Sequence, residues 1–403
     1  MARLFTSGFE INSLTSEMEF NTITGSPTLS SSIKRSGSYS MRCNPSSATA
    51  YASIIFNSSF VADIYCRAYI RIDTAPSADT LILQFSNVGT LQAGIILKTD
   101  RTLQGVGQLK ATIGSPSSAL SLNTWYRVEM WAANPGATTG SSDFRLDGTS
   151  FASHTAASPD IDTFDQFEVG IIESTSADVY FDDVAINDTA GSFQTSWPGV
   201  GSIVHITPDG DSSLGWATIN PASPTTHYDK VNENPPDNAT SYIEDTTLNN
   251  KDIFTLASTS SAGINSGDTI TLITANTRWM DVGLSSATLT VGISDGTNEE
   301  TGNLDVDSSD TWATNTHHAQ AGTLNYRPAV TLYNQVGSST TVMSPSDVDG
   351  YLITAKNGDG DTYRVSGLWV LIEYVPAAGG AASGNDWPIM TPSSKKFWSW
   401  RYS

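Results

Sequence analysis

The sequence predicts an all-β protein with two tandem antiparallel β-sandwich domains, jelly-roll-like in style, and an extended C-terminal tail. Apolar and polar residues alternate with a period of two along much of the chain, as strands with one buried face require. Clusters of Gly, Ser, Asn, Asp and Pro separate these segments, and helical periodicity is scarce. The 403 residues also exceed the length at which a single hydrophobic core usually keeps growing, which favours two domains.

The first domain is predicted over residues 1–195. Its alternating segments indicate strands at 66–72, 80–85, 94–98, 125–131, 144–146 and 167–172. A closing strand at 178–186 is expected to pair with an opening strand near residues 8–10. Residues 192–199, Ser-Phe-Gln-Thr-Ser-Trp-Pro-Gly, interrupt the alternation and mark the domain boundary.

The second domain is predicted over residues 196–376. Its strands are expected at 269–274, 287–293, 329–333, 351–355 and 367–374. Residues 294–297 and 357–361 are predicted to be hairpin turns, because Gly and Asp tolerate the left-handed backbone that such turns need. Residues 377–403 then form a linker of small residues, predicted to be flexible, and a tail.

The charge balance limits the partners that we expect. The chain has 20 Lys and Arg against 41 Asp and Glu, a formal net charge of −21, which argues against nucleic acid because phosphate binding needs clustered basic residues. No run of eighteen apolar residues predicts a membrane span. Residues 1–10 lack the apolar run of a signal peptide, so we expect no secretion by that route.

The two cysteines fall on apolar strand faces. Cys43 follows Tyr39 and Met41 at alternate positions, and Cys66 begins an alternation with Ala68 and Ile70. Buried free thiols are expected, because an unpaired cysteine packs as a small hydrophobic residue. A disulfide between them stays open as the alternative, since two positions in a sequence do not decide it.

Catalytic motifs are missing from the sequence. Its histidines, at positions 154, 205, 227, 317 and 318, show no metalloprotease spacing, and we find no nucleophile elbow, Cys-x-x-Cys pair or phosphate loop. Glu168 and Glu173 are an odd interval apart, so regular alternation would place them on opposite faces, unlike the carboxylate pair of a glycosidase. We therefore expect that the protein is not an enzyme.

Adjacent carboxylates in the closing strand suggest a metal site. Asp182 and Asp183 repel each other unless a cation or a ring of backbone donors compensates them. Calcium, which binds six to eight oxygens, would fit, and Glu10 comes near if the first and last strands pair. The alternative is a pair of solvated acidic residues at a strand end.

The tail differs in composition from the rest of the chain. It concentrates five aromatic and three basic residues, the types that most often anchor interfaces. It is therefore predicted to be a docking segment, although it could instead fold back on its own domain. The predicted docking residues are Trp387, Phe397, Trp398, Trp400, Arg401 and Tyr402.

The first domain resembles the concanavalin A-like, laminin-G-like sandwich family. The matching pieces are the opening Phe9-Glu10, residues 122–129 (Leu-Asn-Thr-Trp-Tyr-Arg-Val-Glu) and the closing residues 181–186 (Phe-Asp-Asp-Val-Ala-Ile). The resemblance implies a lectin-like domain in which Glu10, Asp182 and Asp183 help to hold a structural calcium ion. The glycan-binding residues are not specified by it, since the family is functionally broad.

The chain up to residue 376 resembles tailed-bacteriophage virion proteins in which a lectin-like sandwich precedes a second β domain. Residues 227–245, 251–256 and 367–376 carry this resemblance. It implies a non-enzymatic virion structural protein: a head decoration, a head fibre or a tail-associated subunit, made in the host cytoplasm. The C-terminal region would dock to capsid or tail proteins, and the first domain would be displayed.

The resemblance also implies partners. A homo-oligomer is expected, with a trimer favoured, and host surface glycans are candidate ligands. The rival hypothesis is a free carbohydrate-binding protein, in which exposed strand aromatics such as Tyr69, Trp125 or Trp131 stack on sugar rings.

Overall fold

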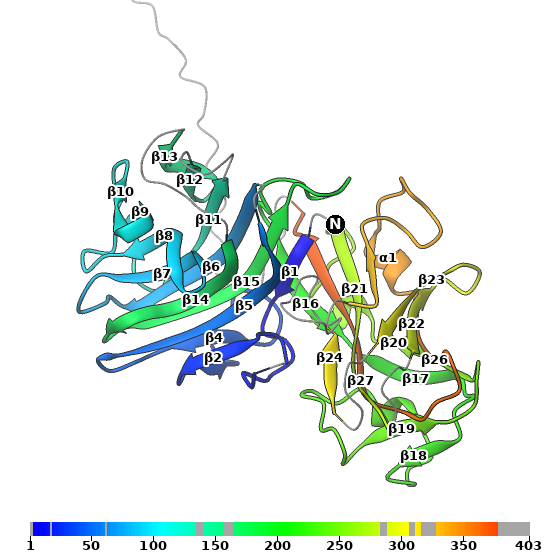
Figure 1. Ribbon diagram of the computed structural model, residues 1–403. Helices are drawn as coiled ribbons and strands as arrows, with labels where there is room; N and C mark the ends of the chain where they lie inside the picture. Colours follow the sequence, from blue (N-terminus) through cyan, green and yellow to red (C-terminus); the bar gives the residue numbers. More distant parts are fainter. Residues whose placement is uncertain are drawn as a thin grey trace, which may run out of the picture.

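The computed structural model describes residues 3–16, 18–60, 63–133, 140–155, 164–282, 288–305, 311–315 and 328–377. Two β-sandwiches lie side by side, with β1 and β16 between them (Figure 1). Within the described ranges the only α-helix is the single turn α1 (Pro345–Val348). The predicted fold class, tandem antiparallel sandwiches, is confirmed.

The first sandwich contains two antiparallel sheets that enclose one core running from Leu4 to Ile186. One sheet has the order β13 (Thr149–His154), β12 (Ser141–Leu146), β11 (Trp125–Ala133), β6 (Ile64–Thr74), β15 (Asp178–Asp188), β4 (Ser40–Cys43) and β3 (Thr28–Ser30), with β1 (Arg3–Ser7) also paired to β15. The other has the order β10 (Thr112–Ile113), β9 (Leu103–Gly107), β8 (Thr90–Leu97), β7 (Thr80–Asn87), β14 (Phe164–Thr175), β5 (Ala48–Phe60) and β2 (Thr22–Gly25).

The second sandwich has its own core, which runs from Val204 to Tyr374. One sheet has the order β18 (Thr218–Asn220), β19 (Tyr242–Asp245), β27 (Tyr363–Val375), β21 (Thr269–Asp281) and β24 (Ala313–Asn315), with β16 (Ser202–Ile206) on β27 and β25 (Val330–Leu332) on β21. The other has the order β17 (Pro208–Ser213), β20 (Lys251–Leu256), β26 (Leu352–Asn357), β22 (Thr288–Ser294) and β23 (Glu299–Asp305).

Period-two alternation explains how β6 forms the centre of its sheet. Cys66, Ala68 and Ile70 are fully buried in the core, while the polar residues between them face the opposite side of the sheet. Both cysteines, Cys43 and Cys66, are buried and free. The expectation of buried free thiols is therefore confirmed, and the two cysteines do not form a disulfide.

The opening and closing strands pair, although the opening strand is Arg3–Ser7 and ends just before residues 8–10, where it was predicted. Strands β1 and β15 are antiparallel, with Phe5 opposite Ile186 and Ser7 opposite Val184. A bulge interrupts the ladder between β15 and β6 at residues 182–185, and Asp183 takes a left-handed backbone with φ of +50°. Because a bulge re-aims side chains, simple alternation does not describe where Asp182 and Asp183 point.

One of the two predicted hairpin turns is confirmed. Ser294 and Glu299 are paired at the end of the β22–β23 hairpin, and Gly296 supplies a φ of +87° between them. The prediction for 357–361 is wrong, because β26 and β27 belong to different sheets of the sandwich. Those residues carry the chain from one sheet to the other, which a turn-forming composition alone does not distinguish from a hairpin.

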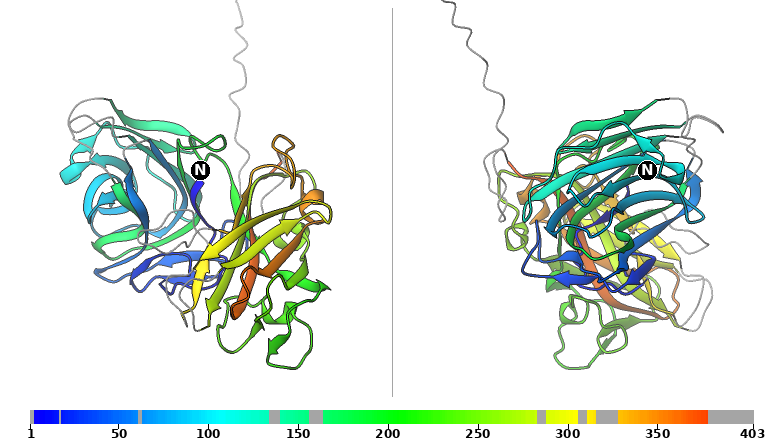
Figure 2. Two further views of the ribbon diagram at one scale, coloured as in Figure 1. Left: turned by 45° about the vertical axis from the view of Figure 1, so that its right-hand side comes forward. Right: turned by 90° about the vertical axis from the view of Figure 1, so that its left-hand side faces the viewer.

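The segment between the domains lies against the outer face of the first sheet. Trp197 is held by the guanidinium of Arg145 at 3.8 Å from its ring and by the edge of Tyr65 at 5.3 Å between centroids. The main-chain N–H of Gly199 donates to Glu129 at 2.9 Å. Trp197 and Gly199 thus attach the connection to the first sandwich, and the two sandwiches lie next to each other in Figure 2.

Candidate functional site

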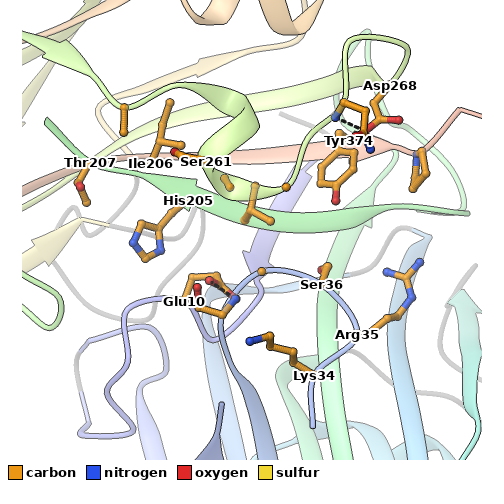
Figure 3. Close-up of a pocket in the computed structure, with 18 residues that line it drawn as sticks. Glu10, Lys34, Arg35, Ser36, His205, Ile206, Thr207, Ser261, Asp268 and Tyr374 are labelled. Atoms are coloured by element: carbon orange, nitrogen blue, oxygen red, sulfur yellow. Dashed lines mark hydrogen bonds between the residues drawn. The ribbon is translucent and has the colours of Figure 1, made fainter. Parts of the chain in front are cut away.

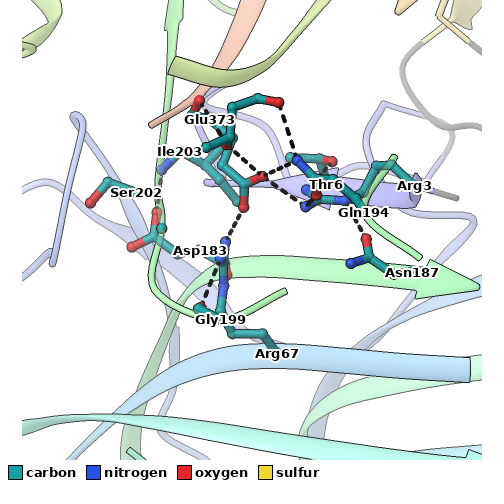
Figure 4. A network of polar contacts seen from close by, with 12 residues as sticks. Arg3, Thr6, Arg67, Asp183, Asn187, Gln194, Gly199, Ser202, Ile203 and Glu373 are labelled. Carbon is teal, nitrogen blue, oxygen red and sulfur yellow. Dashed lines mark hydrogen bonds and ion pairs between the residues drawn. The ribbon is translucent and has the colours of Figure 1, made fainter. Parts of the chain in front are cut away.

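A buried ion-pair triad joins the two domains (Figure 4). Glu373 on β27 lies between Arg3 on β1, at 2.7 Å, and Arg67 on β6, at 2.8 Å. The three side chains are almost fully buried, at 0%, 0% and 3% exposure for Arg3, Arg67 and Glu373. Burial alone would raise the pKa of Glu373, but the two guanidinium groups outweigh it and lower that pKa to about 2.

Protein groups satisfy most of the remaining donors of the triad. Arg3 donates to the side chain of Asn187 at 2.7 Å and to that of Gln194, while Arg67 donates to the main-chain oxygen of Asp183 at 3.0 Å. A buried charge pair stabilises a fold only where such additional hydrogen bonds are present. The triad therefore connects β1 and β6 of the first sandwich to β27 of the second.

A second pair, Arg35 and Asp183, makes a further contact at the junction. The guanidinium of Arg35 lies 2.5 Å from Asp183 and also donates to the main-chain oxygen of Gly201 at 2.9 Å. Asp183 in turn accepts from the main-chain N–H of Ile203 on β16 at 2.6 Å. The ring of Tyr69 lies beneath Arg35, 3.4 Å from its guanidinium carbon, so Tyr69 is part of the junction.

The three residues predicted to hold calcium lie together, and each uses its oxygens for protein donors. Glu10 accepts from the main-chain N–H of Ser38 and Tyr39, at 2.9 and 3.2 Å. Asp182 accepts from the main-chain N–H groups of Arg35 and of Asp183, both at 2.8 Å. Asp183 is compensated by the Arg35 guanidinium.

This arrangement does not resemble a cation site. Among the residues that the structure describes, no group of three or more His, Cys, Asp and Glu side chains could hold a metal ion. The alternative, that Asp182 and Asp183 are solvated at a strand end, is wrong, because both side chains are fully buried. Calcium bound by Glu10, Asp182 and Asp183 stays a prediction.

A cleft of about 590 Å³ opens between the domains beside these residues (Figure 3). Its first-domain wall is Glu10 and the loop 34–38, and its second-domain wall is residues 204–207 with the turn 257–268. Tyr374 and Pro376, at the end of β27, also line it. Its size falls within the range of small-molecule sites.

Burial shifts the protonation of the acids and the histidine around the cleft. It raises the pKa of Glu10 to about 8, although the main-chain donors of Ser38 and Tyr39 oppose the shift. It raises the pKa of Glu19, which lies near Glu10, to about 8 as well. It lowers the pKa of His205 to about 4. At neutral pH the cleft therefore presents a protonated Glu10 and an uncharged His205.

Gly37 is expected to be required for the position of Glu10. Its φ is +59°, and a Cβ there would lie 2.1 Å from a carboxylate oxygen of Glu10. Gly37→Ala should lower the free energy of unfolding by more than the roughly 1–2 kcal/mol of a left-handed alanine alone, because Glu10 must also move. Chemical denaturation measures this loss.

Gly89→Ala is the matched control for that substitution. Gly89 also has a positive φ, +75°, but open space surrounds its Cβ position. Equal losses for the two variants would contradict the role given to Gly37.

The structure separates the sequence-predicted site residues into three groups. Glu10, Asp182 and Asp183 come together at the junction. Tyr69 is buried there and Trp131 stacks on Tyr65, with 6.2 Å between ring centroids. The predicted docking residues all lie outside the described residues: Trp387, Phe397, Trp398, Trp400, Arg401 and Tyr402.

Sequence reasoning missed Arg3, Arg67, Glu373 and His205. A charged residue at a core-like position of a strand was the available signal for Glu373, which interrupts the apolar run 368–374. No sequence pattern linked it to two arginines that lie more than 300 residues earlier in the chain.

No family model and no curated protein sequence matches this chain. Solved structures with similar folds include an endo-β-1,4-glucuronan lyase from the fungus Trichoderma reesei, at 15% identity, covering 46% of this chain and 95% of the lyase with a TM-score of 0.36. The cellulose-induced protein Cip1 has 18% identity, and the match covers 48% of this chain and 99% of Cip1 with a TM-score of 0.36. Trypanosoma rangeli sialidase has 13% identity, and the match covers 46% of this chain and 30% of the sialidase with a TM-score of 0.31.

These neighbours are β-rich proteins whose names refer to carbohydrate, and they include enzymes. The expectation that this protein is not an enzyme is corrected accordingly, since a lyase and a sialidase stand among the structures of similar fold. None of these three structures is a bacteriophage virion protein by name. In the described part of the chain, no helix has the length and hydropathy to cross a membrane.

Proposed function

We propose that this protein binds carbohydrate in the cleft between its two domains. The observation that carries the proposal is the lining of the cleft, in which hydroxyl, amide, carboxyl and imidazole groups converge with the cationic groups of Lys34 and Arg35 beside short apolar side chains. Such a mixture of donors and acceptors with little net charge suits a hydroxyl-rich ligand. His205 adds an uncharged ring to this lining.

Two cleft residues are suited to a test because their side chains make few contacts with other protein groups. Lys34 is half-buried and its ammonium donates to the main-chain oxygen of Ser31 at 3.0 Å. Thr207 contributes a half-buried side chain to the opposite wall. We expect Lys34→Ala and Thr207→Val each to weaken oligosaccharide binding about 2- to 12-fold, from the loss of one hydrogen bond each.

The measurement is a glycan array with the full chain, followed by calorimetry on the best ligand. Lys98→Ala is the control, since Lys98 pairs loosely with Asp100 at 3.9 Å and is not among the residues that line the cleft. A blank array, or equal weakening by Lys98→Ala, would defeat the proposal.

A structural subunit of a bacteriophage virion is the second candidate. The buried Arg3–Glu373–Arg67 triad favours it, because an appendage must transmit force between its domains without bending at their junction. Mass spectrometry of purified particles tests it, and absence of the chain from the particles would exclude it.

A further inference from the structure

The described chain ends at the rim of the cleft. Pro376 lines the cleft, and the main-chain N–H of Ala377 donates to the carboxylate of Asp268 at 2.9 Å. Asp268 is itself part of the cleft wall and also accepts from the main-chain N–H of Asn265 at 2.7 Å. Residues 378–403 therefore begin where the cleft opens.

The composition of residues 385–403 is unusual for this chain. The segment has five aromatic residues, Trp387, Phe397, Trp398, Trp400 and Tyr402, and three basic ones, Lys395, Lys396 and Arg401. Asp386 is its one acidic residue, in a chain whose formal net charge is −21. A peptide of this kind is attracted to the acidic body and gains most by burying its rings.

The cleft offers complementary chemistry. Ala257, Ala262 and Pro376 contribute apolar side chains to it, while Val204 and Ile206 lie almost fully buried behind its wall, and Asp268 places a carboxylate there. An indole ring against these apolar side chains leaves its N–H for a polar partner, and a neighbouring basic side chain can meet the carboxylate. Lys34 and Arg35 also line the cleft, and Arg35 is paired with Asp183. The cleft therefore offers the segment apolar contact for its rings and, at Asp268, an acceptor for one of its basic side chains.

The segment is long enough to return to the cleft. Nine residues, 378–386, separate Ala377 from Trp387, and nine residues span at most about 30 Å. A tethered segment acts at an effective concentration of roughly 1 mM. An intrinsic dissociation constant of about 100 µM would then suppress a competing ligand about tenfold.

We propose that residues 385–403 of the same chain occupy the cleft and exclude other ligands until they are displaced. The exclusion of carbohydrate rests on the function proposed above, whereas the occupation of the cleft does not. The segment thereby acts as an internal competitor whose release exposes the site.

Hydrogen exchange tests the occupation without any carbohydrate. We compare the full chain with a chain that ends at Ala377 and keeps every described residue. Removal of the segment should speed amide exchange in the loop 34–38 and the turn 261–265, and a synthetic peptide of residues 385–403 should restore the slower rates. Identical exchange in the two chains, with no effect of the peptide, would overturn the proposal.

Matched peptides separate the contributions of rings and charges. Replacing Trp398 and Trp400 by Ser keeps the charge, and replacing Lys395, Lys396 and Arg401 by Gln keeps the rings. Each peptide should protect the cleft less than the natural one, and equal protection by both would contradict the complementarity. Protection in the full chain that grows with protein concentration would also overturn the proposal, since it would place the segment of another copy in the cleft.

Carbohydrate binding then completes the test. The shortened chain should bind the best array ligand about tenfold more tightly than the full chain, and equal affinity would overturn the competition. If neither chain binds carbohydrate but exchange still depends on the segment, the occupation is supported and only the proposed function fails.

Discussion

Glu373→Gln should lower the free energy of unfolding by about 3–5 kcal/mol, the largest effect that we expect from a single substitution. The change leaves Arg3 and Arg67 buried at the junction without the carboxylate that compensates them, and an uncompensated buried charge costs about this much. Urea unfolding at neutral pH, followed by tryptophan fluorescence, measures the loss.

Glu244→Gln is the control for this prediction. Glu244 pairs with Arg364 at 2.6 Å, but both side chains are partly exposed, at 20% and 29%, so the loss should stay within about 1 kcal/mol. Replacing the whole triad by Met, Met and Leu should recover most of the stability that Glu373→Gln loses, because no charge is left unpaired. A loss with Glu373→Gln no larger than with Glu244→Gln would show that the triad does not hold the domains together.

Stability should fall as the pH rises from about 5 to 9, and Glu10 should account for a large share of the loss. The folded state keeps a proton on Glu10 until about pH 8, whereas the unfolded chain releases it near pH 4.5. Protonation therefore favours the folded state, and this advantage is lost as the pH rises through that window. With one pKa unit worth about 1.4 kcal/mol, the loss amounts to a few kcal/mol.

Glu10→Gln tests the assignment, because glutamine resembles the protonated acid. The variant should match the natural chain near pH 5, be more stable near pH 9, and retain the part of the slope that Glu19 contributes, since the pKa of Glu19 is also raised to about 8. Melting temperatures across this pH range give the comparison. An unchanged slope in the variant would remove Glu10 as the source.

The fold was largely predictable because each strand carries its own alternation. The segment around Cys66, Ala68 and Ile70 required no knowledge of its neighbours to be placed in a sheet. The pairing of β1 with β15 followed from the sandwich architecture. The turn at 357–361 was misassigned because its composition permits both a hairpin and a crossing between sheets.

The site was less predictable because it depends on contacts between distant residues. The carboxylates of Asp182 and Asp183 were correctly expected to need compensation, but the sequence could not show that Arg35 and backbone donors provide it. The bulge at residues 182–185 interrupts the alternation of the strand, so the sequence pattern does not give the directions of these two side chains. His205 had no distinguishing pattern at all.

The segment around Trp197 has a consequence for how the protein can be divided. A cut after residue 195 would remove Trp197, whose ring contacts Arg145 and Tyr65. It would also remove Glu373, the ion-pair partner of Arg3 and Arg67. The first sandwich would then expose two arginines that the intact protein keeps from water. The two sandwiches are therefore not interchangeable modules, and the smallest unit that can be transplanted into another protein is the pair.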